Sequence, residues 1–302
     1  MLHNFVKQKE TSMMSIDVED GLNILMNDFF NIKMPPTQRV IKNVNILLNL
    51  FEGNNVRGTF FILGEIAASY PDLVRSISKA GHEIGVHGLH HEQLFRLSRD
   101  KAKEDIFRAR EMVEDISGTK VYGFRAPAFS ISQKNSWALE LIAELGFQYD
   151  SSIMPAKANR YGWPGFNKEI VRLEMPDGGS LIEVPLSVVK ILGRTVPACG
   201  GGYLRHLPYF FTRNAINSIQ KDRPAVIYLH PYELDKEKYP DFFYQARSYS
   251  ELRKRLPLML YRLNKKGVEK KLRNLVMEFN FKPIKDVIEE SEKQGKLAVK
   301  YL

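Results

Sequence analysis

The chain has 302 residues, 44% of them hydrophobic, which is enough apolar material for one sizeable core and argues against several independent domains. Its formal net charge is +9, and the excess is concentrated near the C-terminus without a recognisable nucleic-acid-binding module, so nucleic acid is not an expected partner. The single cysteine, Cys199, excludes an internal disulfide and a cysteine-based zinc site, so any bound metal must be held by histidine and carboxylate.

The first residues show no targeting signal. Lys7, Lys9 and Glu10 interrupt the region where a signal peptide carries its apolar stretch, and no apolar run approaches the roughly 20 residues of a membrane-spanning helix. We therefore expect a cytoplasmic protein. Residues 1–12, which largely precede the first strand-like segment, are interpreted as a flexible arm.

Short apolar runs alternate with longer amphipathic segments along most of the chain. This order is typical of parallel strands joined by crossover helices and predicts an α/β fold, a β/α barrel over residues 13–250. The predicted strands are Met13–Asp17, Gly58–Leu63, Glu83–Val86, Val121–Phe124, Leu181–Val184 and Ala225–Leu229. The predicted helices are Thr37–Phe51, Pro71–Ala80, Ser98–Ile116, Asn135–Leu145 and Tyr209–Gln220. Repeated Pro and Gly make Ser152–Ser180 an irregular insertion.

Ionisable residues follow most of the predicted strands. In a β/α barrel the carboxyl ends of the strands meet at one mouth, where such enzymes keep their chemistry. The sequence therefore predicts one site built from five strand ends: Asp17, Glu19 and Asp20 at the first strand, His87 after the third, Arg125 after the fourth, Glu183 at the fifth and His230 after the sixth.

The strongest single motif is His87-Gly88-Leu89-His90-His91. His87 and His91 face the same way if the chain turns helically after the strand, and two imidazoles at that spacing can bind one divalent cation. The alternative is a polar surface loop. Two histidines plus one carboxylate with an open position is a recurring catalytic zinc arrangement, and His90 is expected to point elsewhere.

Three carboxylates lie within four residues at the end of the first strand. Their mutual repulsion disfavours burial unless a cation or an arginine offsets it, whereas an acidic turn that ends a strand is the simpler alternative. Strand pleating places Asp17 and Glu19 on one side, and Asp20 joins them only if the strand breaks at Glu19. The carboxylate ligand is therefore Glu19 or Asp20.

Two further strand ends complete the predicted site. Arg125 precedes a stiff turn, Ala126-Pro127, which suits a guanidinium fixed against a carboxylate, either in catalysis or in a structural ion pair. A buried strand carries His230 to the mouth, where it can act as an acid if it has reach and a suitable pKa. Alone, such a histidine is more often a hydrogen-bonded residue at the edge of a core.

Residues 251–302 form a basic segment with 14 Lys and Arg against 7 Asp and Glu. Helical periodicity predicts a C-terminal extension that packs on the barrel through Leu256, Leu258, Leu260, Leu263 and Leu272. The alternative is peripheral contact with an anionic membrane surface or an acidic polymer.

These motifs, in this order, resemble the polysaccharide deacetylase family, also called the NodB-homology or carbohydrate esterase family 4 group. The resemblance runs from about Ser15 to Asp235 and implies a distorted (β/α) barrel of about seven strands. It rests on Asp17–Asp20, His87–His91, Arg125-Ala126-Pro127 and Leu229-His230-Pro231. Residues Tyr149–Ile153, Glu183–Leu186 and Gly200–Tyr203, with the basic extension, are similar to the branch associated with exopolysaccharide biosynthesis.

The resemblance also implies an activity, the metal-dependent hydrolysis of N-acetyl or O-acetyl groups on a polysaccharide or oligosaccharide with release of acetate. It implies Asp17 as general base, Arg125 as the residue that orients Asp17, and His230 as the acid that protonates the departing amine. It implies a divalent metal, zinc by default, that is held by His87, His91 and one carboxylate. That carboxylate is Glu19 or Asp20, and the choice stays open because this chain lacks the family's common pair of adjacent aspartates. Substrate contacts are expected from Pro127, Phe129, Glu183 and Tyr203.

Two other functions compete with this interpretation. The first is a metal-independent, allantoinase-like hydrolase of C–N bonds in a small amide, which the intact His87 and His91 pair argues against. The second is a carbohydrate-binding barrel that has lost catalysis, which has little need for Asp17 and His230 together with both histidines of the pair.

Overall fold

The computed structural model describes residues 11–157, 162–176, 178–248, 259 and 263–302. Residues 1–10 of the expected flexible arm, and Leu256, Leu258 and Leu260 of the predicted packing face, lie outside these ranges. The arm predicted over residues 1–12 includes Ser12, which is buried and begins the first strand. The prediction was wrong at that residue.

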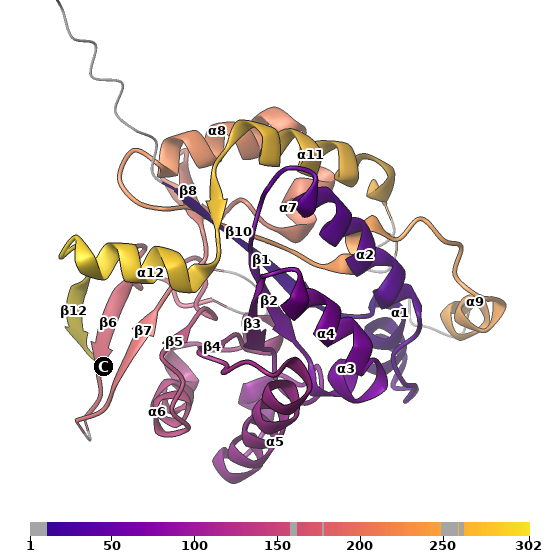
Figure 1. The fold of residues 1–302 in the computed structure, drawn as a ribbon, viewed down its shortest axis with the longest axis horizontal. Helices are drawn as coiled ribbons and strands as arrows, with labels where there is room; N and C mark the ends of the chain where they lie inside the picture. Colours follow the sequence, from indigo (N-terminus) through magenta and orange to yellow (C-terminus); the bar gives the residue numbers. More distant parts are fainter. Residues whose placement is uncertain (1–10, 158–161, 177, 249–258, 260–262) are drawn as a thin grey trace, which may run out of the picture.

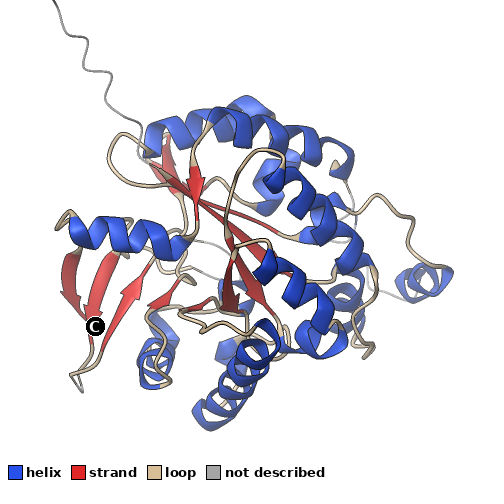
Figure 2. Ribbon diagram, viewed as in Figure 1, coloured by secondary structure: helices blue, strands red, loops and turns tan. Residues whose placement is uncertain are grey.

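A largely parallel sheet forms the centre of the molecule (Figure 2). Seven strands pair in parallel in the order β10-β1-β2-β3-β4-β5-β7, and β6 continues the sheet antiparallel to β7. The predicted α/β fold of about seven strands is thereby confirmed. The bounds of these strands are Ser12–Val18 (β1), Thr59–Ile62 (β2), Glu83–Val86 (β3), Gly123–Phe124 (β4), Tyr149–Asp150 (β5), Val171–Glu174 (β6), Ser180–Glu183 (β7) and Val226–Leu229 (β10).

Helices surround this sheet and connect its parallel strands (Figure 1). Local sequence signals set their ends: Pro71 is the first residue of α4, and α5 begins after Ser98, whose hydroxyl accepts from the Lys101 amide, and ends at the left-handed Gly118. All five predicted helices are present. The longer helices are Arg39–Glu52 (α2), Pro71–Lys79 (α4), Arg99–Ser117 (α5), Trp137–Glu144 (α6), Tyr209–Ile219 (α8), Asp241–Ser248 (α9), Val268–Glu278 (α11) and Ile284–Lys293 (α12).

Short helical turns and a small hairpin complete the described elements. They are Gly21–Ile24 (α1), the π-helix Leu25–Phe29 (η1), Gly64–Ser69 (α3), Gly201–His206 (α7), the 3₁₀ turns Leu94–Arg96 (η2), Pro127–Phe129 (η3), Gln133–Asn135 (η4), Pro231–Leu234 (η5) and Lys265–Gly267 (η6), and strands Val188–Ile191 (β8) and Arg194–Pro197 (β9). None of the described helices is both long and apolar enough to cross a bilayer.

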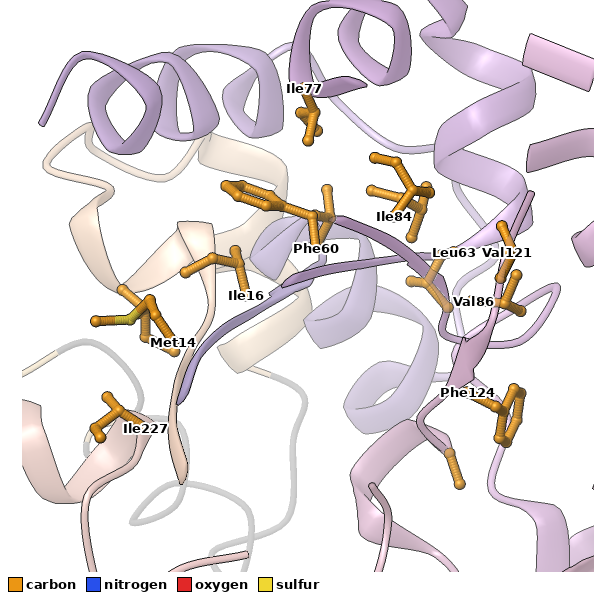
Figure 3. Packing of buried hydrophobic residues seen from close by; sticks show 14 of the residues in the cluster. Met14, Ile16, Phe60, Leu63, Ile77, Ile84, Val86, Val121, Phe124 and Ile227 are labelled. Carbon is orange, nitrogen blue, oxygen red and sulfur yellow. The ribbon is translucent and has the colours of Figure 1, made fainter. Parts of the chain in front are cut away.

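Alternate side chains of β1 point to opposite faces of the sheet, one toward the hydrophobic core and the other toward the candidate site. Met14 and Ile16 belong to the large cluster that lies between the sheet and the outer helices (Figure 3). The alternate residues Ser15 and Asp17 therefore point to the opposite, inner face, because successive side chains of a strand alternate. Every residue of β1 is buried, so the inner polar groups need partners inside the protein.

The described part of the C-terminal segment, residues 263–302, contains β-strands as well as helices. Leu272 in α11 and Val287 in α12 are buried, in agreement with a packed extension, but Leu263 is 42% exposed and does not pack as predicted. The segment also adds Phe281–Lys282 (β11) beside β1 and Ala298–Tyr301 (β12) beside β6, which a purely helical prediction missed.

The predicted irregular insertion 152–180 contains ordered structure. β6 pairs in antiparallel register with β7, with buried Val171 and Leu173 alternating with more exposed residues. Pro and Gly residues are frequent on both sides of β6, and because they are typical of loops this short strand was not predicted from the sequence.

We expect His82 to make stability pH-dependent. Its ring packs against Phe51 and Phe60, and its Nδ1 accepts from the Gly58 amide at 3.3 Å. Burial, with the charge of Arg57, lowers the pKa of His82 to about 4.

Because the folded state keeps His82 neutral while the unfolded chain protonates near its ordinary pKa, this contribution is complete above about pH 6.5 and is lost as pH falls toward 4. The wild type should lose about 2 kcal/mol more unfolding free energy between about pH 7 and pH 5 than His82→Gln, measured by urea denaturation. Equal losses in the two proteins would rule out His82 as the source.

Candidate active site and metal centre

Side chains from four strand ends meet on the inner face of the sheet. Asp17 and Glu19 come from the end of β1, His87 follows β3, Arg125 follows β4, and His230 follows β10. Because these strands are parallel, their carboxyl ends open at the same edge of the sheet. The structure therefore brings together the predicted residues of four strand ends, and Asp17, Glu19, His87 and Arg125 are each at most 3% exposed.

Glu19, His87 and His91 form a cluster suited to a metal ion. Glu19 Oε1 lies 3.0 Å from His87 Nε2 and 3.2 Å from His91 Nε2. One ligand atom from each residue lies within 4.8 Å of the other two. Two imidazole nitrogens and one carboxylate oxygen are the donors of a common catalytic zinc site, so the residues present fit a divalent cation.

The remaining ring nitrogens of both histidines have oxygen acceptors. His87 Nδ1 donates to the Arg125 carbonyl at 2.7 Å, and His91 Nδ1 donates to Asp28 Oδ2 at 3.0 Å. Both rings therefore present Nε2 to Glu19. No sequence motif marks Asp28, which lies in the π-helix η1.

The charges of this cluster are strongly coupled. Burial opposes ionisation of Glu19, but His91, His230 and His87 around it hold its pKa well below the usual range. Burial also opposes protonation of His91, yet Glu19 and Asp28 raise its pKa to about 10. A negative carboxylate at the centre of three imidazoles thus attracts positive charge, whether protons or a cation.

Arg125 fixes one oxygen of Asp17 and leaves the other free. Its Nη1 donates to Asp17 Oδ1 at 2.8 Å and to Ser15 Oγ at 2.7 Å, and its Nε donates to the Ser151 carbonyl at 2.9 Å. The guanidinium also lies over the Phe61 ring at 4.3 Å. Asp17 Oδ2 is buried and has no hydrogen-bond partner among the described residues. This oxygen is available as a base.

His230 lies opposite that free oxygen. Its Nε2 is 3.8 Å from Asp17 Oδ2 and 3.9 Å from Glu19 Oε2, and its ring stacks on Tyr232 at 4.8 Å. Burial would lower the pKa of His230, but Glu19, Glu233 and Asp17 raise it to about 9. The ring is therefore poised to carry a proton beside the metal cluster.

Part of this site lies in a stretch of the chain that matches a protein-family model. Residues 38–149 match the family model described as polysaccharide deacetylase, and this stretch contains His87, His91 and Arg125. Over residues 38–149 the chain is therefore similar to polysaccharide deacetylases. Asp17 and Glu19 lie before the matched stretch, so their place in the site follows from the geometry. Residues 151–289 match a second model, described as a domain of unknown function (DUF3473).

Known proteins are similar to this chain in part of its sequence and in its fold. The chain is 30% identical over 108 residues to the peptidoglycan deacetylase of Helicobacter pylori, covering 36% of each protein, and it spans about a third of the length of the first curated relatives that it matches. A crystal structure assigned as a polysaccharide deacetylase from Mycobacterium smegmatis is 22% identical, with a TM-score of 0.66 over 97% of this chain and 93% of that one. The structure of PuuE allantoinase, 13% identical, has a TM-score of 0.61 over 95% and 92% of the two chains, so the two proteins share a fold.

Asp20 is separated from the cluster of Glu19, His87 and His91. Its carboxylate caps α1 and accepts from the backbone amides of Leu22 and Thr37. Both oxygens therefore already have donors. Of the two carboxylates that the sequence left open, Glu19 lies in the cluster and Asp20 does not.

Glu183 lies in the interior of the protein, without the exposed surface that a substrate contact requires. It is fully buried beside Asp150, and its Oε1 accepts from the Ile153 amide at 3.1 Å. Burial, followed by the charge of Asp150, raises the pKa of Glu183 well above its usual range. The structure thus places Glu183 in a buried pair with Asp150 and not at the predicted substrate contact.

Two other predicted substrate residues, Pro127 and Phe129, are also buried. Pro127 and Phe129 form the turn after Arg125, where Ala128 and Phe129 adopt left-handed backbone angles and the Phe129 ring meets Tyr228 edge-on at 4.7 Å. Tyr203 is half-buried on α7.

A cavity of about 570 Å³ opens beside His91, and Asp28, Lys33, Glu65 and Arg96 are among the residues that line it. A larger cavity of about 1020 Å³ lies at the opposite edge, beside Thr11, Pro224 and Asn280, which precede the strands, and no residue of the metal cluster lines it.

Proposed function

We propose that this chain is a metal-dependent deacetylase that hydrolyses N-acetyl or O-acetyl groups on a polysaccharide or oligosaccharide and releases acetate. The observation that carries the proposal is the convergence of Glu19, His87 and His91 beside the free oxygen of Asp17. An allantoinase-like reaction without metal has no use for this three-ligand cluster.

Asp17, Arg125 and His230 have different roles in the proposed hydrolysis. Asp17 Oδ2 takes a proton from the attacking water, while Arg125 holds Oδ1 and keeps the carboxylate oriented. His230, whose Nε2 lies 3.8 Å from Asp17 Oδ2, protonates the departing amine nitrogen. A divalent cation, when bound by Glu19, His87 and His91, supplies Lewis-acid polarisation of the acetyl carbonyl and lowers the pKa of the water.

Zinc is the proposed metal, and an acetylated glycan is the proposed substrate. Two imidazoles with one carboxylate are typical zinc donors. The Helicobacter pylori relative is named a peptidoglycan deacetylase, which supports a glycan as the substrate class. The cavity of about 570 Å³, which His91 lines, falls within the size range of small-molecule sites.

Removal of the metal tests this function. Acetate release from N-acetylated oligosaccharides should fall at least about 100-fold after treatment with a chelator, and added Zn²⁺ should restore it. His87→Gln should lose the activity, whereas His82→Gln provides the matched control, because His82 precedes β3 and lies outside both the cluster and the cavity beside His91.

Activity that survives chelation and the His87→Gln change would contradict the metal-dependent mechanism and favour the metal-free reaction. A wild-type protein that binds acetylated glycans without releasing acetate would instead support the carbohydrate-binding alternative.

A further inference from the structure

The two histidines of the metal cluster have matching surroundings. Each directs Nε2 toward Glu19 Oε1 and donates its Nδ1–H to an oxygen. For His87 the acceptor is the backbone carbonyl of residue 125, which stays in place when the side chain of Arg125 is changed. For His91 the acceptor is the side chain of Asp28, which a single substitution can remove.

We propose that Asp28 is a positioning residue of the metal centre, whose carboxylate holds His91 in the tautomer and ring orientation that present Nε2 to the cation. A carboxylate on the second nitrogen of a metal-binding imidazole fixes the ring and makes the ligand more basic. This inference rests on the proposed metal-dependent function and adds a residue to it.

The segment that carries Asp28 is anchored by packing on one side and by polar bonds on the other. Leu22, Leu25 and Met26 pack with Tyr239 and Phe243. The Met34 amide donates to Asn27 Oδ1 at 3.0 Å, which ties the end of the segment back to the π-helix η1. Single-turn π-helices are frequent at functional sites because they re-aim side chains. The fold therefore holds Asp28 in place before any metal binds.

The neighbouring histidine supplies an internal comparison. His90 Nδ1 lies 3.0 Å from Glu65 Oε2, the same distance that separates His91 Nδ1 from Asp28 Oδ2. His90, however, has a side chain that is 59% exposed and lies outside the cluster, whereas the side chain of His91 is 12% exposed and lies inside it. Glu65→Gln thus changes an equivalent carboxylate–imidazole pair without touching a metal ligand.

The affinity of the full chain for Zn²⁺ alone, measured by competition with a chromophoric chelator, tests the role of Asp28. Asp28→Ala should weaken zinc binding by about 10- to 100-fold. Asp28→Asn should lose less, because its amide oxygen can still accept from His91 Nδ1–H, and Glu65→Gln should bind as the wild type does. His91→Gln sets the upper limit of the loss. The unfolding temperature of the metal-free Asp28→Ala protein should stay near that of the wild type.

Zinc affinity of Asp28→Ala equal to that of Glu65→Gln would overturn the inference, while the loss in His91→Gln would leave the proposed function standing. A lowered unfolding temperature in metal-free Asp28→Ala, in proportion to its loss of zinc affinity, would show a purely structural role and also overturn it. A wild-type chain that binds no zinc would overturn the proposed function itself.

Discussion

Asp17→Asn is expected to lower acetate release by about 10²- to 10⁴-fold, the usual contribution of a positioned general base. The amide keeps the size of the side chain, and its oxygen can still accept from Arg125 Nη1, which now lies 2.8 Å from Oδ1. What disappears is the basic, unpartnered Oδ2. Because Asp17 lies outside the group of metal ligands, zinc affinity should stay close to that of the wild type.

Neighbouring carboxylates provide the controls for this change. Asp20→Asn removes an equally buried charge three residues away. Asparagine still caps α1 through the Leu22 amide and loses only the acceptor for the Thr37 amide, so activity should be largely retained. Glu19→Gln should lose zinc affinity and activity together. An Asp17→Asn protein that keeps near-wild-type turnover would show that another group takes the proton from water.

The main features of the site follow from residue type and strand position. His87, Arg125 and His230 each come directly after a short apolar run, and a parallel sheet gathers such positions at one edge whatever the details of the helices. The inner direction of Asp17 and Glu19 likewise follows from the pleat of an alternating strand. These features depend on local pattern, which a single sequence displays.

The choice between Glu19 and Asp20 depended on a contact distant in sequence. Asp20 turns away because the amides of Leu22 and Thr37 bind its carboxylate, and Thr37 lies 17 residues further along the chain. Asp28 was missed for the same reason, since it meets His91 across 63 residues from a π-helix that has no sequence signature.

The buried acid pair was also missed. β5 is only two residues long, too short for an alternating pattern, so Asp150 was not placed at a strand end. Without Asp150 as its neighbour, Glu183 was predicted to be a substrate contact at the mouth. The structure shows that the same strand-end position can face the interior beneath Arg125, where burial controls its charge.

Arg125→Met is expected to lower the free energy of unfolding by about 3–5 kcal/mol, because removal of one partner leaves buried charge uncompensated. The Arg125 guanidinium is fully buried and pairs with Asp17. Burial raises the pKa of Asp150 and of Glu183, and the charge of Arg125 opposes both rises. Methionine replaces much of the volume but none of the charge or hydrogen bonds. Arg172→Met, which breaks the half-exposed pair with Glu292, should cost less than about 1 kcal/mol in the same urea titration.

A second substitution separates lost charge from lost packing. If uncompensated carboxylate charge causes the loss, Asp150→Asn should recover part of the stability in the Arg125→Met background, although Asp150→Asn alone disturbs the Ser152 hydroxyl that bonds to Asp150 at 2.6 Å. Arg125→Lys should be intermediate, since an ammonium keeps the charge but cannot reach Asp17, Ser15 and the Ser151 carbonyl at once. Additive losses in the double variant would show that Arg125 stabilises the fold through its packing against Phe61 rather than by neutralising the acids below the site.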